Sequence, residues 1–364
     1  MTRPYIERVV LGEDRGLCSW LIRLVLWPLS VLYRVGLAAY LAAYRLGLRK
    51  RHVLSVPVIS VGNLTFGGTG KTPAVLSICR MLTQREKRVV VLSRGHGGSA
   101  KGSLIVSDGT SILCDAAESG DEPMLLACSL LGVPVIVGKD RRVTGELACE
   151  RFSPDIILLD DGLQYWQLNR DLDILVLDAK KPFGSGFVMP MGDLREPLSG
   201  LSRAGVVLAT NSSEMDESAF ADLGASIQKF APNTHIYRCT HTPSTLIRVR
   251  DGEPLTLDWL RSAEVVAFCG IGHPESFTRT LESLGAVVVK RLDFPDHHPF
   301  SDQDIEMIET ERKANSARAV VTTEKDIARL SGKAAINDLY TLGITLEIED
   351  SASFAEYISN RIND

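Results

Sequence analysis

The sequence has no excess of positive charge and no paired cysteines. Its 40 Lys and Arg are outnumbered by 45 Asp and Glu, and the formal net charge of −5 excludes a polycationic surface for nucleic acid. The seven cysteines are an odd, scattered set without a Cys-x-x-Cys pair, so neither a disulfide framework nor a zinc site is indicated. The 364 residues, 45% of them apolar, instead have the composition of a folded protein of a reducing compartment, long enough for two domains.

An uninterrupted apolar run long enough to cross a bilayer is also missing, although the stretch at 17–48 is the most apolar of the chain. Arg23, Arg34 and Arg45 divide it into runs of ten residues. Because eleven residues make about three helical turns, the three arginines share one helix face. The stretch begins too late for a secretory signal and lacks its cleavage site, so we expect it to be retained. Pro28 predicts a kink or a division of the helix.

The charge of this N-terminal part differs from that of the rest. Residues 1–52 carry nine Lys or Arg against three acids, whereas the remaining 312 residues carry a net charge of −11. An apolar helix with an arginine stripe, followed by the basic segment 49–52, favours a helix that lies in the membrane interface with its charges among anionic headgroups. Two alternatives are a core helix whose arginines pair with acids of the body, and a tilted span with snorkelling arginines.

The clearest motif is a glycine-rich loop between a β-branched run at 56–61 and a helical pattern from residue 73. Its ending Gly70-Lys71-Thr72 matches the phosphate loop G-x-x-x-x-G-K-[ST], with Thr65 in place of the leading glycine. Three glycines within the loop still supply the backbone freedom that a phosphate cradle needs. We expect Lys71 to reach the β- and γ-phosphates and the Thr72 hydroxyl to bind Mg²⁺. The predicted nucleotide-binding residues are Thr65, Phe66, Gly67, Gly68, Thr69, Gly70, Lys71 and Thr72.

Four more apolar runs, at 88–93, 156–159, 172–177 and 205–210, predict the remaining strands of a parallel α/β sheet. The run at 156–159 delivers Asp160 and Asp161 at its carboxyl end, where phosphate-loop proteins hold Mg²⁺ or its water shell. The run at 205–210 is followed by Asn-Ser-Ser-Glu rather than the Asn-Lys-x-Asp that reads guanine, which favours ATP or a loose base choice.

Beyond about residue 230 the pattern restarts. Strands at 263–269 and 286–289 enclose a helix near 274–284, which predicts a second β-α-β unit. His297 and His298 follow in a polar loop. If either faced the phosphate loop, it would orient or share a proton with a carboxylate acting as a base on an alcohol. The alternative is that both are solvated loop residues or helix caps.

Eight motifs occur together along the chain. They are Gly-Gly-Thr-Gly-Lys-Thr-Pro at 67–73, Ser-Arg-Gly-x-Gly-Gly at 93–98, Gly-Asp-Glu-Pro at 120–123, Asp-Asp-Gly-Leu-Gln at 160–164, Leu-Arg-Glu-Pro at 194–197, Gly-Ile-x-x-Pro at 270–274, Asp-His-x-x-Phe at 296–300 and Thr-Glu-Lys-Asp at 323–326. In content and order the set resembles the tetraacyldisaccharide 4'-kinases, the lipid A kinases, from about residue 10 to 340. One departure is Leu163, where many relatives are expected to carry an aromatic residue.

The resemblance implies transfer of the ATP γ-phosphate to the 4'-hydroxyl of a tetraacylated glucosamine disaccharide 1-phosphate, by a peripheral or monotopic enzyme on the cytoplasmic face of the bacterial inner membrane. It implies a P-loop NTPase-like parallel sheet flanked by helices, a smaller second α/β lobe and an N-terminal membrane-associating helix. We place the membrane-docking region at 1–52, the kinase core at 53–230 and the lobe that closes the active-site cleft at 231–364. ATP and Mg²⁺ are the expected cofactors. The lipid and an anionic membrane surface are the expected partners, and neither nucleic acid nor a protein partner is implied.

The resemblance also implies roles for individual residues. Asp121 becomes the base toward the sugar hydroxyl, aided by His297, and Lys71 completes the catalytic set. The expected metal ligands are Thr72, Asp160, Asp161 and Glu196. The residues alone do not rank Asp121 against Asp161 as the base. Candidates to neutralise phosphate charge are Arg94, Arg141 and Arg195. The rival function is a membrane-docked P-loop switch that hydrolyses ATP without a lipid acceptor.

Overall fold

The computed structural model describes the chain except for residues 1–4, 15, 273, 297, 331–335 and 364. The chain forms two compact units, of which the first comprises Met1–Arg94, Gly138–Thr240 and Leu346–Asp364 and the second Gly95–Val137 and His241–Thr345. These units differ from the consecutive parts at 1–52, 53–230 and 231–364 that the sequence suggests. The difference arises because 95–137 packs with the second unit while the last helix returns to the first.

The first unit is built on a parallel sheet in the order β8-β7-β6-β1-β5-β2. Every residue of β1, β2, β5 and β7 is buried, as parallel strands covered on both faces require. The five strands predicted between residues 56 and 210 are present. The strands of this sheet are β1 (Val58–Gly62), β2 (Val89–Ser93), β5 (Ile156–Asp160), β6 (Leu172–Asp178), β7 (Val206–Thr210) and β8 (His235–Arg248), the last of which continues into the second unit.

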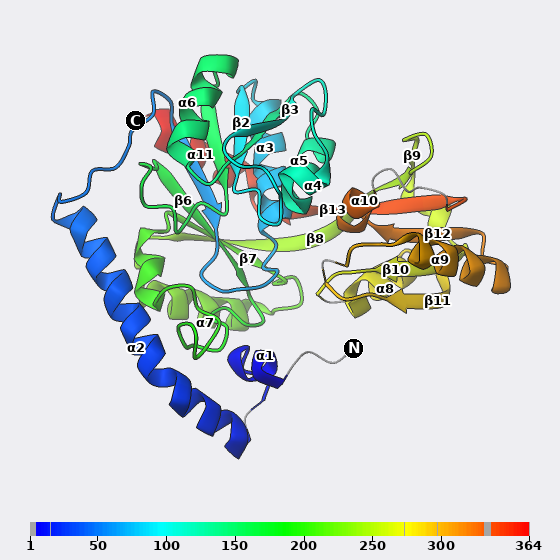
Figure 1. The fold of residues 1–364 in the computed structure, drawn as a ribbon, viewed down its shortest axis with the longest axis horizontal. Helices are drawn as coiled ribbons and strands as arrows, with labels where there is room; N and C mark the ends of the chain where they lie inside the picture. Colours follow the sequence, from blue (N-terminus) through cyan, green and yellow to red (C-terminus); the bar gives the residue numbers. More distant parts are fainter. Residues whose placement is uncertain (1–4, 15, 273, 297, 331–335, 364) are drawn as a thin grey trace. The chain divides into compact units, whose positions relative to one another are not determined.

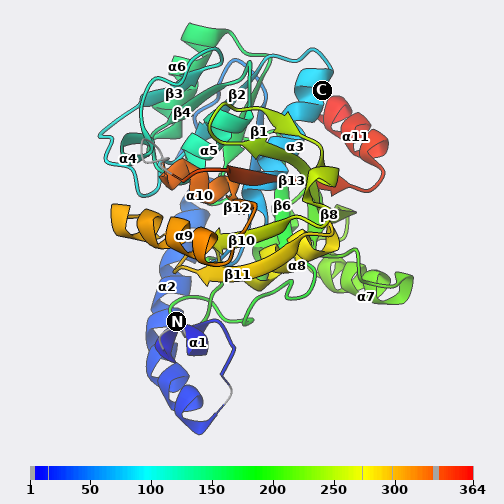
Figure 2. The same ribbon diagram turned by 90° about the vertical axis from the view of Figure 1, so that its right-hand side faces the viewer.

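Helices that follow the strands accompany this sheet, and the apolar faces of several of them explain their places. α3 (Lys71–Gln84) follows β1 and buries Val75, Ile78 and Leu82. The C-terminal α11 (Ser351–Asn363), at the edge of the unit in Figure 2, brings the Phe354 ring to 5.2 Å from the Tyr237 ring of β8. Two further helices are α6 (Arg141–Phe152) and α7 (Glu217–Gln228). These contacts are why the last residues belong to the first unit.

At the N-terminus, the short α1 (Tyr5–Val10) is followed by α2 (Leu17–Arg45), a single helix of 29 residues at the periphery of the first unit (Figure 1). The helix continues through Pro28, so the predicted division at that residue is wrong. Pro28 is exposed, and an exposed ring removes one backbone hydrogen bond without meeting a packed neighbour. By length and composition α2 is apolar enough to cross a membrane, and little of it is buried. It is therefore not a core helix.

The two serines of α2 face the protein, whereas many of its apolar side chains face outward. Ser19 and Ser30 are eleven residues apart on one face and are 1% and 3% exposed. By contrast Trp20, Leu24 and Val25 are more than half exposed. The helix is thus amphipathic in the sense opposite to that of a helix packed on a soluble core.

The second unit contains a smaller parallel sheet in the order β11-β10-β12-β13. Along β10, Val265 and Ala267 pack with the core around α8, while Val266 and Phe268 pack with the core around α9, as the alternation of a strand requires. The second α/β pattern predicted from the sequence is therefore present. These elements are β10 (Glu264–Cys269), α8 (Pro274–Ser283), β11 (Val287–Asp293), α9 (Asp302–Ala314), β12 (Ala319–Thr323), α10 (Glu324–Arg329) and β13 (Leu339–Ile348).

The segment 95–137 contributes an antiparallel pair and two helices to the second unit. The pair is β3 (Leu104–Asp108) with β4 (Pro134–Val137), and the helices are α4 (Ala116–Ser119) and α5 (Asp121–Ser129). A short β9 (Pro254–Leu255) pairs with the second-unit part of β8. These elements were not predicted from the sequence, because the two strands β3 and β4 have only five and four residues.

Candidate active site

The phosphate loop lies between β1 and α3, where the sequence predicts it. Gly67 and Gly70 have φ values of 108° and 90°, which glycine adopts without steric cost. A Cβ placed on Gly67 or Gly68 would meet no heavy atom within 4 Å, so the space beside this part of the loop is open. Lys71 and Thr72 form the first turn of α3, whose backbone N–H groups have no intrahelical acceptor and favour an anion.

Thr65, which replaces the first glycine of the motif, occupies a strand-like position. It pairs with Leu194 in an isolated antiparallel bridge, and the neighbouring Phe66 amide donates to the Asp193 carbonyl oxygen at 2.8 Å. Thr65 is not among the residues with a left-handed backbone, so glycine is not required there. The bridge also holds the segment that carries Arg195 and Glu196 beside the loop.

Asp161 is the electrostatic centre of this site. Arg195 Nη1 lies 2.8 Å from both carboxylate oxygens, and Lys71 Nζ lies 3.9 Å from Oδ1. Burial alone would raise the pKa of Asp161, but the attraction of Lys71, Arg195 and Arg141 outweighs it and holds that pKa below the ordinary range. Arg195 also lies over the Phe66 ring, 5.1 Å from its centroid. The phosphate-loop lysine is therefore grouped with two arginines around one carboxylate.

Asp160 ends β5 opposite Val61 and is only 2% exposed. Its Oδ2 accepts a hydrogen bond from the Ser93 hydroxyl at 2.8 Å, and its carbonyl oxygen accepts one from Arg141 Nη2 at 3.3 Å. Burial lowers the pKa of Arg141, and repulsion from Arg94 adds to this, against the attraction of Asp160 and Asp161. The Ser-Arg-Gly and Asp-Asp-Gly motifs thus meet at the carboxyl ends of two neighbouring strands.

Gln164 connects Arg195 to Glu196 through hydrogen bonds. Its Oε1 accepts from Arg195 Nη1 at 3.3 Å, and its Nε2 donates to Glu196 Oε1 at 3.0 Å. Glu196 also accepts from Arg203 Nη2 at 2.7 Å and is 2% exposed. The carboxylate of Glu196 is therefore engaged with a cation inside the protein.

The predicted metal ligands are not all alike in their surroundings. Within the described part of the chain, no three His, Cys, Asp or Glu side chains gather in a group that could hold a metal ion. Asp161 and Glu196 are paired with arginines. Thr72 and Asp160 are both buried, at 4% and 2% exposure, and Asp160 Oδ2 accepts the Ser93 hydroxyl.

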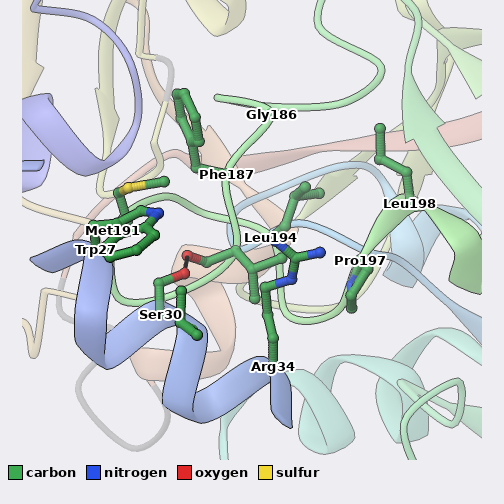
Figure 3. A pocket seen from close by; sticks show the side chains of 11 residues that line it. Trp27, Ser30, Arg34, Gly186, Phe187, Met191, Leu194, Pro197 and Leu198 are labelled. Carbon is green, nitrogen blue, oxygen red and sulfur yellow. Dashed lines mark hydrogen bonds between the residues drawn. The ribbon is translucent and has the colours of Figure 1, made fainter. Parts of the chain in front are cut away.

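α2 is bonded to the same segment that supplies Arg195. The Ser30 hydroxyl donates to the Val188 carbonyl oxygen at 2.7 Å, and the Tyr33 hydroxyl donates to the Arg195 carbonyl oxygen at 2.7 Å. A pocket of about 160 Å³ lies between α2 and residues 186–198, with Arg34 directed into it from the helix (Figure 3). Arg23 donates to the Val9 carbonyl oxygen at 2.8 Å. The arginine face of α2 thus meets the protein at two of its three arginines.

The remaining predicted residues belong to the second unit. Asp121 is the first residue of α5, and its Oδ2 accepts from Arg329 Nε at 2.8 Å. His297 lies outside the described residues. His298 Nε2 lies 3.1 Å from Asp304 Oδ2, in the capping box that begins α9, and its ring stacks on Phe294 at 4.9 Å. His298 therefore contacts the capping box of α9, whose N-cap residue is Ser301.

Gln164, Tyr33 and Arg329 are among the residues of these arrangements that were not predicted from the sequence. Gln164 stands inside the Asp-Asp-Gly-Leu-Gln motif, and Arg329 follows Asp326 by three residues on one helix, a spacing that signals contact. Nothing in the sequence around Tyr33 separates it from the other aromatics of α2.

In this parallel sheet the first strand leads through a glycine-rich loop into a helix, and acids stand at the end of the adjacent strand. This arrangement defines a P-loop phosphotransferase or nucleotidase. Comparison of the chain with known protein families is more specific. The tetraacyldisaccharide-1-P 4'-kinase family model matches residues 22–363, and the chain belongs to this family. The predicted family, the α/β fold class and the assignment as a kinase are therefore confirmed.

Individual relatives cover nearly the whole chain. A tetraacyldisaccharide 4'-kinase of Syntrophus aciditrophicus is 41% identical over 94% of this chain and 93% of its own length, and one of Halothermothrix orenii is 37% identical over 98% and 97%. Among solved structures, LpxK of Aquifex aeolicus in complex with ATP is 33% identical, covers 94% of this chain and 99% of its own, and has a TM-score of 0.77.

Proposed function

We propose that this chain transfers the γ-phosphate of ATP to the 4'-hydroxyl of a tetraacylated glucosamine disaccharide 1-phosphate, a step of lipid A biosynthesis. The observation that carries the proposal is the grouping of Lys71, Arg195 and Arg141 around Asp161 beside the phosphate loop, in a chain that matches the kinase family from residue 22 to 363. Phosphoryl transfer needs mainly positioned groups and neutralised charge, and these cations supply both.

ATP fits the residues of this loop. The open space beside Gly67 and Gly68, the N-terminus of α3 and the three nearby cations suit a polyphosphate. ATP supplies the phosphoryl group when bound. Lys71 then binds phosphate oxygens in place of part of its contact with Asp161, and Arg195 neutralises charge at the same place. Aquifex aeolicus LpxK, the structural relative, is itself described with ATP.

Mg²⁺ also fits, with a smaller ligand set than the sequence suggests. The ion prefers one or two carboxylates together with hydroxyl, water and phosphate oxygens. The Thr72 hydroxyl and the Asp160 carboxylate fit that preference, whereas Asp161 and Glu196 are bonded to Arg195 and Arg203. We therefore propose Thr72 and Asp160 as the direct ligands, with Asp161 acting on the cations around it.

The choice of base follows from the same electrostatics. A carboxylate accepts a proton readily only if its pKa is not strongly lowered. Asp161 has a lowered pKa and accepts hydrogen bonds from Arg195 on both oxygens, so it is a poor base. We propose Asp121 as the base toward the acceptor hydroxyl, with His297 assisting it, as the family resemblance implies.

We also propose that α2 attaches the enzyme to the cytoplasmic face of the inner membrane and lies in the interface. Ser30 and Tyr33 stand near the middle of the helix, and both are bonded to the segment that carries Arg195. A spanning helix would place this middle part, with the polar nucleotide site attached, in the hydrocarbon. An interfacial helix leaves the site in water and buries the outward Trp20, Leu24 and Val25 in lipid.

Transfer of labelled phosphate tests the proposal. Purified protein is incubated with γ-labelled ATP in vesicles with and without the disaccharide lipid, and both labelled lipid and free phosphate are measured. We expect labelled lipid only with the acceptor, and we expect Lys71→Ala to lose most turnover while its melting temperature stays near that of the wild type. Release of free phosphate at the same rate without acceptor, and no labelled lipid, would instead indicate the P-loop switch.

A further inference from the structure

The Thr-Glu-Lys-Asp motif and the glycine at 270 have no role in the mechanism derived so far, although both are motifs of the sequence. Thr323 is the N-cap of α10, and its hydroxyl donates to Asp326 Oδ2 at 2.6 Å. The Gly270 amide donates to Asp326 Oδ1 at 3.0 Å. Asp326 is fully buried, at 0% exposure, so the two motifs hold one carboxylate in a fixed position inside the second unit.

Asp326 in turn holds an arginine. Arg329 Nη1 donates to Asp326 Oδ1 at 3.2 Å and to the Gly270 carbonyl oxygen at 3.0 Å, and the Arg329 side chain is 4% exposed. These bonds determine the direction of the guanidinium. A buried guanidinium with a charged partner and a backbone acceptor has little freedom to rotate, because each departure would leave a buried donor without an acceptor.

The third donor of Arg329 reaches Asp121. The Nε atom lies 2.8 Å from Asp121 Oδ2, and the Asp121 side chain is 31% exposed, so the carboxylate joins a buried cation at one end and remains open to solvent. The order of contacts is therefore Thr323 and Gly270 to Asp326, Asp326 to Arg329, and Arg329 to Asp121. Every member of this series lies in the second unit.

We propose that Arg329 is a positioning residue for Asp121, and that the Thr-Glu-Lys-Asp motif acts on the reaction through it. The inference rests on the proposed role of Asp121 as base. In that reaction the hydroxyl proton moves to Asp121, the hydroxyl oxygen forms a bond to the γ-phosphorus, and the bond from that phosphorus to the β–γ bridging oxygen breaks to release ADP. The Arg329 guanidinium, which bonds one oxygen of Asp121 through Nε, fixes the direction of the receiving carboxylate.

The test compares Arg329→Ala with Arg312→Ala in the full-length protein. Arg312 is the matched control, because it also bonds an acid three residues away, Glu309, and a backbone carbonyl, that of Ala317, and is mostly buried. Both variants lose a comparable internal arginine. We expect Arg329→Ala to lower kcat by about 100-fold with KM for ATP unchanged within threefold, and Arg312→Ala to change neither by more than threefold. Arg329→Gln, which keeps most of the side-chain volume, replaces the alanine variant if that variant does not fold.

Two further measurements separate positioning from a structural role. Guanidinium ion at millimolar concentration should restore part of the kcat of Arg329→Ala and none of that of Asp121→Ala. The double variant Asp121→Ala/Arg329→Ala should be no slower than Asp121→Ala alone, because both substitutions remove one function. Multiplicative losses, absence of rescue, or equal effects of Arg312→Ala and Arg329→Ala would overturn the inference. Wild-type turnover of Asp121→Ala would instead overturn the proposed base, and the inference with it.

Discussion

Neutralising Asp161 is the sharpest test of the electrostatic arrangement at the phosphate loop. In Asp161→Asn the shape is kept, but Arg195, Lys71 and Arg141 lose the carboxylate that now stands among them. Removing one partner of a buried ion pair costs about 3–5 kcal/mol, and less where solvent reaches the pair. The Asp161 and Arg195 side chains are 25% and 20% exposed, so we expect a loss of about 2–3 kcal/mol.

The assay is thermal unfolding followed by circular dichroism. For a unit of roughly 200 residues, 1 kcal/mol corresponds to about 2–4 °C, so Asp161→Asn should melt about 4–12 °C below the wild type at pH 7. Asp155→Asn is the control, because Asp155 pairs with Arg88 at 2.7 Å on the surface, and a surface pair contributes about 1 kcal/mol or less. Equal melting temperatures of Asp161→Asn and wild type at pH 7 would refute the reasoning.

The pH dependence of this difference has a definite sign. The pKa of Asp161 is lowered in the folded protein from an ordinary value of 3.8, so the carboxylate stabilises the fold above that value. The stabilisation is lost as the pH falls through the folded-state pKa. The melting temperatures of wild type and Asp161→Asn should therefore stay apart from neutral pH down to about pH 5 and converge in stronger acid. Mg²⁺-free ATP should raise the melting temperature of the variant more than that of the wild type, since its phosphates replace the lost charge.

Three further outcomes follow from contacts described above. Arg23→Gln should leave the salt dependence of vesicle co-sedimentation unchanged, because Arg23 is bonded to the protein. Arg45→Gln, at an exposed position, should weaken that dependence by about 1 kcal/mol of electrostatic binding. The reverse order of effects would place Arg23 among headgroups. Phe268→Ala should lower the free energy of unfolding of the second unit by about 3–5 kcal/mol in a denaturant titration, since the ring is fully buried. A loss under about 1 kcal/mol would contradict that packing. Ser30→Ala should cost about 1–2 kcal/mol in melting experiments because the buried Val188 carbonyl loses its donor; an unchanged melting temperature would mean that water replaces it.

Local rules sufficed for the phosphate loop and the strands around it. The strand before Gly62, the glycine-rich loop and the helix from Lys71 are adjacent in the sequence, so periodicity and motif spacing predict them together. Asp160 was predictable for the same reason, since an aliphatic run that ends in an acid places the acid at the sheet edge. The sequence also indicates that the phosphate loop tolerates Thr65 in place of glycine, and the bridge between Thr65 and Leu194 gives Thr65 a strand-like position.

What could not be predicted depends on partners far apart in the sequence. The contact between Asp121 and Arg329 joins residues 208 positions apart, and no single-sequence pattern connects them. The contact of Arg23 could not be predicted for a related reason, because a helical repeat says which side chains share a face but not what that face meets. Arg23 meets the Val9 carbonyl rather than a headgroup. Catalytic roles that depend on residues from two distant segments, such as that of Asp121, remain predictions.

The apolar outer face of α2 has a consequence for making a form of this enzyme that is soluble without detergent. The usual remedy for an insoluble anchor is truncation, but deleting the helix also removes Ser30 and Tyr33, which bond the segment that carries Arg195. Substitution is the better route. Val25, Leu32 and Val35 are 74%, 69% and 60% exposed, so glutamate or lysine at these positions would change the solvent-facing surface and leave the bonds of the opposite face in place.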